Sequence, residues 1–237
     1  MTLAWIPNTL TTGNLLLGFI SVIYSSHGNY QGYITAGLLI LAAALLDGLD
    51  GPVARRLNVS SPLGGELDSL ADCVTFGVAP GYLAYKAYLS ESTIPMFGNI
   101  DIVGIFIASI FPICAAYRLA RFNISSDKNS FTGLPSPIAG VIVALVPICF
   151  INVVIPKIIF AFSFVIIGLL MVSTVKYSKP KYYLFKNIHG FKLIIFIIAI
   201  ALILIFFRQW TVFIFISLYI LSGILSFIIQ FIQDHKY

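Results

Sequence analysis

Acidic side chains are concentrated in one short stretch of this sequence. Of the nine acidic residues in the chain, five lie between positions 47 and 72: Asp47, Asp50, Glu66, Asp68 and Asp72. Asp47 and Asp50 are spaced i,i+3, and Asp68 and Asp72 are spaced i,i+4, so each pair occupies one face of a predicted helix. If these two helices pack as an antiparallel pair, the four aspartate carboxylates converge.

Four converging carboxylates repel one another unless a cation lies between them. Carboxylate oxygens are the ligands that Mg²⁺, Mn²⁺ and Ca²⁺ prefer in proteins. Four of them can hold two ions, which is the arrangement that clamps a phosphoryl group during displacement. The competing interpretation is that the aspartates form ion pairs with Arg55, Arg56, Arg118 and Arg121.

The segment between the two aspartate pairs carries residues suited to binding phosphate. Gly51 permits close approach of a backbone, and Ala54 and Gly64 are small enough to leave room for a ligand. Arg55 offers a fork of donors that matches phosphate oxygens. Pro52 suits the first position of a helix, which predicts that a short helix begins there with free N-terminal amides.

The elements that position these residues are predicted to be membrane helices. Hydrophobic residues make up 59% and charged residues 10% of the 237 positions, whereas a soluble domain carries about 25% charge. A spanning helix needs about 20 mostly apolar residues. The sequence predicts an all-α, polytopic membrane helix bundle with about eight spans, at 9–25, 33–50, 64–85, 100–122, 137–155, 157–175, 190–207 and 211–232. The first span lacks the basic segment and cleavage site of a signal peptide, so we expect it to be retained.

The cations are divided unequally between the two sides of this predicted bundle. With eight spans, eleven of the 14 Lys and Arg residues share one side, and only Lys86, Lys157 and Arg208 fall on the other. Because basic loops stay in the cytoplasm, we expect a multi-pass protein of the cell (inner) membrane. Both termini and the aspartate site would then be cytoplasmic. The basic residues indicate orientation, and no nucleic acid is expected as a partner.

Eight residues of the aspartate region fit one pattern, D-x2-D-G-x2-A-R-x8-G-x3-D-x3-D. They are Asp47, Asp50, Gly51, Ala54, Arg55, Gly64, Asp68 and Asp72. The pattern resembles the signature of the CDP-alcohol phosphatidyltransferase family. Segments 6–14, 60–72, 118–123 and 131–137 are similar to the integral-membrane phosphatidylserine synthases of that family. The resemblance implies a six-helix family core in residues 1–180 and two additional membrane helices in residues 181–237.

The resemblance also implies a reaction and its site. The phosphatidyl group of CDP-diacylglycerol would pass to the hydroxyl of L-serine, giving phosphatidylserine and CMP. The four aspartates would hold divalent cations, Mg²⁺ or Mn²⁺ with Ca²⁺ as an alternative, at two ions per site. Asp72 would also accept the proton of the attacking hydroxyl. The residues expected to bind the cytidine and its phosphates are Asn8, Gly51, Ala54, Arg55 and Ser61.

Two further arginines, Arg118 and Arg121, lie i,i+3 at the end of the fourth predicted span. They are interpreted as an anion pocket for the serine carboxylate or a lipid phosphate, with anchoring at the membrane surface as the alternative. The family resemblance also implies a homodimer in contact with membrane lipids.

The sequence leaves other functions open. Only the resemblance selects serine, so glycerol 3-phosphate or an inositol phosphate could be the acceptor instead. A divalent-cation transporter could also place aspartates inside a helix bundle. Such sites lie more often near the bilayer midplane at broken helices, and they do not require Gly51, Ala54 and Arg55.

Overall fold

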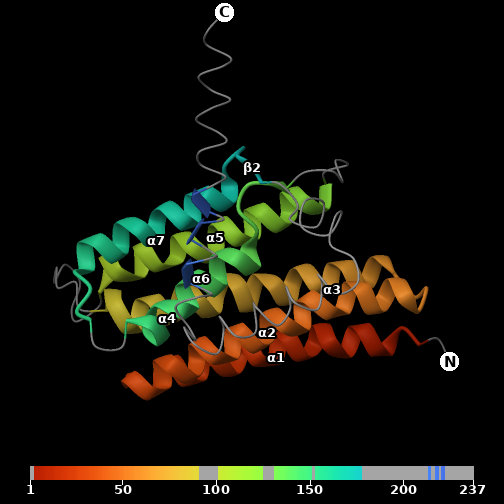
Figure 1. The fold of residues 1–237 in the computed structure, drawn as a ribbon, viewed down its shortest axis with the longest axis horizontal. Coiled ribbons are helices and arrows are strands. Elements are labelled where there is room, and N and C mark those ends of the chain that lie inside the picture. The colour runs from red at the N-terminus through yellow and green to blue at the C-terminus, as the bar shows by residue number, and fades with distance from the viewer. Residues whose placement is uncertain are drawn as a thin grey trace, which may run out of the picture.

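The computed structural model describes residues 3–90, 101–124, 131–150 and 153–177, and the six positions 213, 214, 217, 218, 220 and 221. Within this part of the chain the helices run back and forth along one long axis (Figure 1). The separate α-helices are α1 (Trp5–Ser26), α2 (Tyr30–Arg56), α5 (Ile102–Ile124), α6 (Ser136–Cys149) and α7 (Lys157–Val172). Between α2 and α5 lies one continuous helical segment that changes between α and π geometry. Its parts are α3 (Pro62–Asp72), η1 (Cys73–Val78), α4 (Ala79–Ala84) and η2 (Tyr85–Leu89).

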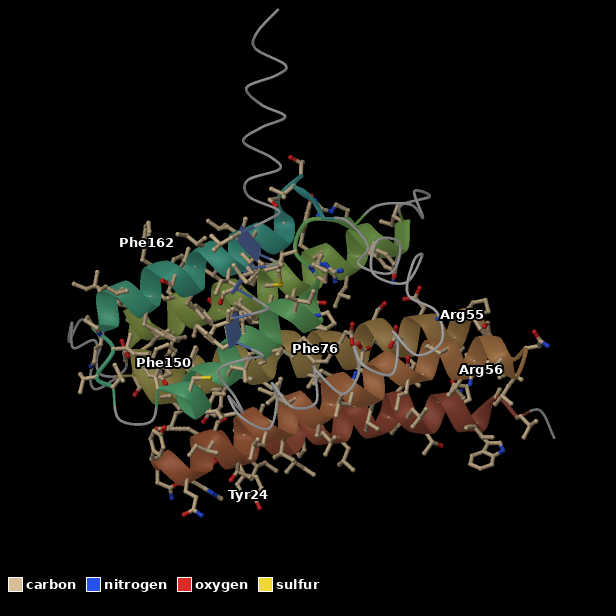
Figure 2. The ribbon with its side chains drawn as sticks, viewed as in Figure 1. Tyr24, Arg55, Arg56, Phe76, Phe150 and Phe162 are labelled. Atoms are coloured by element: carbon tan, nitrogen blue, oxygen red, sulfur yellow. The ribbon has the colours of Figure 1, made fainter. Side chains whose placement is uncertain are left out.

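Each of the six spans predicted between residues 9 and 175 corresponds to a helical segment. Three helices, α1, α2 and α5, are long and apolar enough to cross a membrane, and α6 and α7 are shorter apolar helices. Large apolar side chains such as Phe106 and Phe162 are exposed, and Figure 2 shows Phe162 on the outside of the bundle, as expected where lipid is the solvent. The structure therefore agrees with a membrane helix bundle. Span 190–207 and most of 211–232 lie outside the described residues, so the count of eight and the division at residue 180 stay predictions.

The prediction of a new helix at Pro52 is wrong. Helix α2 continues through this proline and ends only at Arg56. Proline within a helix lacks an N–H, and its ring crowds the carbonyl four residues earlier, but its fixed φ is itself helical. The chain leaves the helix only at Asn58, whose φ of 54° is left-handed.

A tight turn joins α2 to α3. The amides of Asn58 and Val59 donate to the carbonyls of Arg55 and Ala54, which is the Schellman pattern that closes a helix around a left-handed residue. Two residues later, Ser61 Oγ accepts from the amide of Gly64 at 3.1 Å and caps α3. Because one helix ends and the next begins within a few residues, the aspartates at the end of α2 lie close to those on α3.

The inward face of α1 is made of small and polar residues at spacings of three and four: Thr11, Asn14, Gly18, Ser21 and Ser25. Small residues let membrane helices approach closely. A Cβ atom on Gly18 would lie 2.3 Å from Thr75 Oγ1 in η1. Ser21 Oγ donates to the Ala36 carbonyl of α2 at 3.0 Å. These contacts pack α1 tightly against both helices that carry the aspartates.

The apolar core lies between the helices at the middle of the bundle. Phe76 of η1 is fully buried (Figure 2), and it clusters with Ile40 of α2 and Ala144 of α6. A second cluster joins α5, α6 and α7 around Phe111 and Phe164. A short antiparallel pair, β1 (Phe131–Thr132) with β2 (Lys176–Tyr177), connects the segment before α6 to the segment after α7. The two ends of the segment that contains α6 and α7 are therefore held together.

We expect Gly18→Ala to destabilise the fold by about 1–3 kcal/mol, the usual cost of forcing an extra group into a packed interface. Thermal unfolding of the purified protein in nanodiscs measures the change. The matched control is Gly48→Ala on α2, where a Cβ meets nothing within 4 Å. Equal unfolding temperatures for the two variants would contradict the close packing of α1 on η1.

Candidate active site

The four aspartates of the pattern meet where α2 leads into α3. One carboxylate oxygen from each of Asp47, Asp50 and Asp68 lies within 4.8 Å of the other two. Asp72 is within hydrogen-bonding reach of Asp47, and Asp68 is within reach of Asp50. The convergence predicted from the i,i+3 and i,i+4 spacings is present in the structure.

The surroundings of these carboxylates fit a divalent cation. Asp50 and Asp72 are each only 7% exposed, so little water is available to solvate their charges. Asp68 Oδ1 is buried and has no hydrogen-bond partner, and a buried oxygen of this kind is costly unless a ligand completes it. The donor set consists of carboxylates, which suits Mg²⁺, Mn²⁺ or Ca²⁺.

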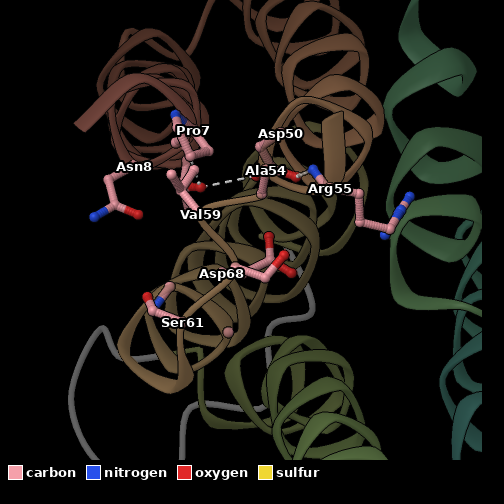
Figure 3. Close-up of a pocket in the computed structure, with 13 residues that line it drawn as sticks. Pro7, Asn8, Asp50, Ala54, Arg55, Val59, Ser61 and Asp68 are labelled. Atoms are coloured by element: carbon pink, nitrogen blue, oxygen red, sulfur yellow. Dashed lines mark hydrogen bonds between the residues drawn. The ribbon is translucent and has the colours of Figure 1, made fainter. Parts of the chain in front are cut away.

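A pocket of about 180 Å³ adjoins this cluster, with Asp50 and Asp68 in its wall. It lies between α1, the end of α2 and the beginning of α3 (Figure 3). All five residues expected to bind the donor nucleotide and its phosphates line it: Asn8, Gly51, Ala54, Arg55 and Ser61. The structure therefore brings the predicted donor residues and two of the predicted metal ligands to one place.

Small residues keep the pocket open. A Cβ on Gly64 would lie 3.3 Å from Ser61 Oγ and 3.4 Å from Asn8 Oδ1, so the absence of a side chain there leaves space between α1 and α3. Arg55 is exposed, and its guanidinium lies over Gly51, 3.3 Å from where a Cβ would be. In Figure 3 its side chain extends from α2 away from Asn8 and Ser61. The arginine thus flanks the pocket with its cation facing solvent.

The two arginines of α5 face different neighbours. Arg118 is 7% exposed, donates to Ser136 Oγ at 2.7 Å, and is close enough to Asp47 and Asp72 to attract both carboxylates. Arg121 donates to the Val172, Met171 and Ser173 carbonyls at 2.8, 3.3 and 3.2 Å.

Arg121 therefore satisfies the carbonyls at the C-terminus of α7, where a cation also complements the helix dipole. Arg118 instead adjoins the aspartate cluster.

Sequence reasoning assigned no role to two polar side chains on α1. Thr11 Oγ1 donates to Asp50 Oδ2 at 2.8 Å, and Asn14 Nδ2 donates to Asp72 Oδ1 at 3.3 Å. The sequence did contain a signal for them. Polar residues that recur at helical spacing within a membrane span are costly to expose to lipid, so they indicate a buried polar partner. The partner itself could not be identified from the spacing.

Comparison with known proteins adds an independent finding. The sequence model of the CDP-alcohol phosphatidyltransferase family matches residues 4–175. A protein of Helicobacter pylori named CDP-diacylglycerol–serine O-phosphatidyltransferase is 37% identical over 236 residues, covering 96% of this chain and 92% of the relative. Proteins of the same name are 35% identical in Bacillus subtilis, covering 78% of this chain and 97% of the relative, and 37% identical in Methanocaldococcus jannaschii, covering 84% and 82%.

We expect Mn²⁺ to raise the unfolding temperature of the purified protein in the absence of substrate. A cation that binds only the folded state stabilises it by about 2.7 kcal/mol at 100 times its dissociation constant. Asp50→Asn and Asp68→Asn should reduce this shift. Asp101→Asn is the control, because Asp101 caps α5 through the amide of Gly104 and should leave the shift unchanged. An equal shift in all three variants would contradict a cation site at the cluster.

Proposed function

Because the chain belongs to the CDP-alcohol phosphatidyltransferase family, we propose that it transfers the phosphatidyl group of CDP-diacylglycerol to the hydroxyl of L-serine. The products are phosphatidylserine and CMP. The observation that carries the proposal is the cluster of Asp47, Asp50 and Asp68, with Asp72 beside Asp47, next to a pocket lined by all five predicted donor residues. The choice of serine is supported by the names of the relatives from Helicobacter pylori and Bacillus subtilis.

In this proposal the pocket receives the cytidine end of the donor. Asn8 and Ser61 offer polar groups to the nucleotide, while Gly51 and Ala54 leave room for its phosphates. Arg55 swings from solvent onto the diphosphate and adds charge-assisted hydrogen bonds. Asp47, Asp50, Asp68 and Asp72 would hold two divalent cations, which neutralise the diphosphate and stabilise the leaving group when bound.

Asp72 accepts the proton of the serine hydroxyl. The hydroxyl oxygen then forms a bond to the phosphorus of the phosphatidyl group, and the bond from that phosphorus to the bridging oxygen breaks. CMP leaves with the electron pair of the broken bond. Asp72 is suited to this role because it is buried beside Asp47 and lies on the side of the cluster nearer to Arg118.

Arg118 is the residue we assign to the acceptor carboxylate. It is a buried guanidinium next to the proton acceptor, with Ser136 holding its Nη1. A guanidinium in a low-dielectric setting binds a carboxylate through two parallel hydrogen bonds. Arg121, which sequence reasoning grouped with Arg118, would act here by fixing the end of α7.

We also propose that the aspartate end of the bundle faces the cytoplasm. Figure 2 places Arg55 and Arg56 at one end and Tyr24 and Phe150 toward the other. Arg118 and Arg121 share the end of Arg55, which agrees with the excess of cations predicted for the cytoplasmic side. The acyl chains of the donor would stay in the adjoining lipid. The homodimer implied by the family resemblance stays a prediction.

We expect the purified protein to convert CDP-diacylglycerol and labelled serine to phosphatidylserine and CMP only when Mg²⁺ or Mn²⁺ is present. Parallel assays with glycerol 3-phosphate and an inositol phosphate test the acceptor. Asp72→Asn should abolish turnover and largely spare donor binding, because the amide cannot take up the proton. Undiminished product in EDTA would refute the role of metal, and a fully active Asp72→Asn variant would remove the role of that residue.

Arg118→Lys should raise the KM for serine about tenfold or more, since a lysine loses the two parallel hydrogen bonds, and should leave the KM for CDP-diacylglycerol within about twofold. Arg121→Lys is the matched control on the same helix. It should lower the unfolding temperature through the lost contacts to α7 and leave the serine KM nearly unchanged. The assignment is wrong if Arg121→Lys raises the serine KM more than Arg118→Lys does.

A further inference from the structure

We propose that Thr11 and Asn14 of α1 are positioning residues of the metal centre, each holding one signature aspartate in place by a hydrogen bond. Neither residue belongs to the aspartate pattern, and both lie on a different helix from the carboxylates they contact. This inference rests on the proposed metal-dependent transfer and adds a role for α1 in it.

The Thr11 hydroxyl has two acceptors within reach, and the Asp50 carboxylate is the nearer one. Its hydroxyl lies 2.8 Å from Asp50 Oδ2 and 3.1 Å from the Pro7 carbonyl of its own helix. One hydroxyl proton serves one acceptor well, and the shorter, charge-assisted contact to the carboxylate is the stronger of the two. Thr11 is 4% exposed, so water does not compete for the bond. The remaining Asp50 oxygen accepts from the Gly51 amide.

Asn14 contacts Asp72 in a way that folding alone does not explain. The side chain is fully buried, and its Nδ2 donates to Asp72 Oδ1 at 3.3 Å. Its own Oδ1 is buried without a hydrogen-bond partner. A structural asparagine in an apolar interior satisfies both ends of its amide. Here Nδ2 donates to a signature aspartate and Oδ1 has no hydrogen-bond partner, so the contact to Asp72 is the interaction that accounts for a polar side chain at this buried position.

Both residues are carried by a helix that is itself held firmly. The backbone carbonyl of Asn14 accepts a hydrogen bond from Thr75 Oγ1 at 3.1 Å. Thr75 lies three residues after Asp72 on the same continuous helical segment. Gly18, one turn further along α1, packs directly against Thr75. Thr11 and Asn14 are separated by about one helical turn. Their two hydrogen bonds therefore fix the carboxylates of Asp50 on α2 and Asp72 on α3 relative to the same helix, α1.

The direct test is Mn²⁺ binding to the full-length protein in nanodiscs without substrate, measured by the loss of the free Mn²⁺ signal in electron paramagnetic resonance. Thr11→Val and Asn14→Leu keep the side-chain size and remove the donor. Each should weaken Mn²⁺ binding about tenfold or more, the usual effect of losing a partner that orients a metal ligand. In the serine assay kcat should fall while the KM for serine stays within about twofold. Thr11→Ser, which retains a hydroxyl, should restore both.

The matched control is Ser21→Ala, which removes a buried hydrogen bond between α1 and Ala36 away from the aspartates. It should lower stability without changing Mn²⁺ affinity. If Thr11→Val and Asn14→Leu bind Mn²⁺ as tightly as the wild type does, or if Ser21→Ala weakens binding equally, the inference is wrong while the proposed transfer stands. A wild-type protein that binds no Mn²⁺ would overturn the metal-dependent function and this inference together.

Discussion

Mutual repulsion of carboxylates is the constraint that the rest of this structure has to meet. Two unit charges about 4 Å apart repel by about 4 kcal/mol at an effective dielectric constant of 20, and Asp47, Asp50 and Asp68 approach one another within 4.8 Å. Packing elsewhere that prevents the helices from separating helps a bundle, whose net stability is of the order of 5–15 kcal/mol, to hold such a cluster. A bound cation would convert the same repulsion into attraction, which is the physical reason for proposing a cation at this site.

The fold resists this repulsion through the turn between α2 and α3 and the packing of α1. The Schellman turn at Asn58 and the cap at Ser61 leave the chain little freedom between the two aspartate pairs. Helix α1 lies against both helices through small and polar residues, and a Cβ on Gly18 would overlap Thr75 of η1. Because lipid gives no hydrophobic drive to helix association, close packing and interhelical hydrogen bonds have to supply the cohesion.

The two arginines of α5 illustrate how one helix can serve both stability and binding. Residues three positions apart point about 60° away from each other around the helix axis. Arg118 is thereby turned toward Ser136 and the aspartates, while Arg121 reaches the carbonyls that end α7. Gly133 packs directly against the Arg121 guanidinium with a φ of 84°, which leaves that cation enclosed by backbone. The end of α7 is therefore held by a cation that does not need to touch substrate.

The five predicted donor residues that line the pocket were implied by the family resemblance. The sequence alone was enough to predict the helices between residues 9 and 175 and the convergence of Asp47, Asp50, Asp68 and Asp72. These features depend on helical periodicity and on a short connection, both of which are local. Only the tertiary structure revealed that α2 continues through Pro52. It also revealed the contacts of Arg121 with the last carbonyls of α7, of Thr11 with Asp50, and of Asn14 with Asp72. Those contacts join residues 39, 58 and 51 positions apart. They depend on which faces of separate helices meet, and no local spacing encodes that.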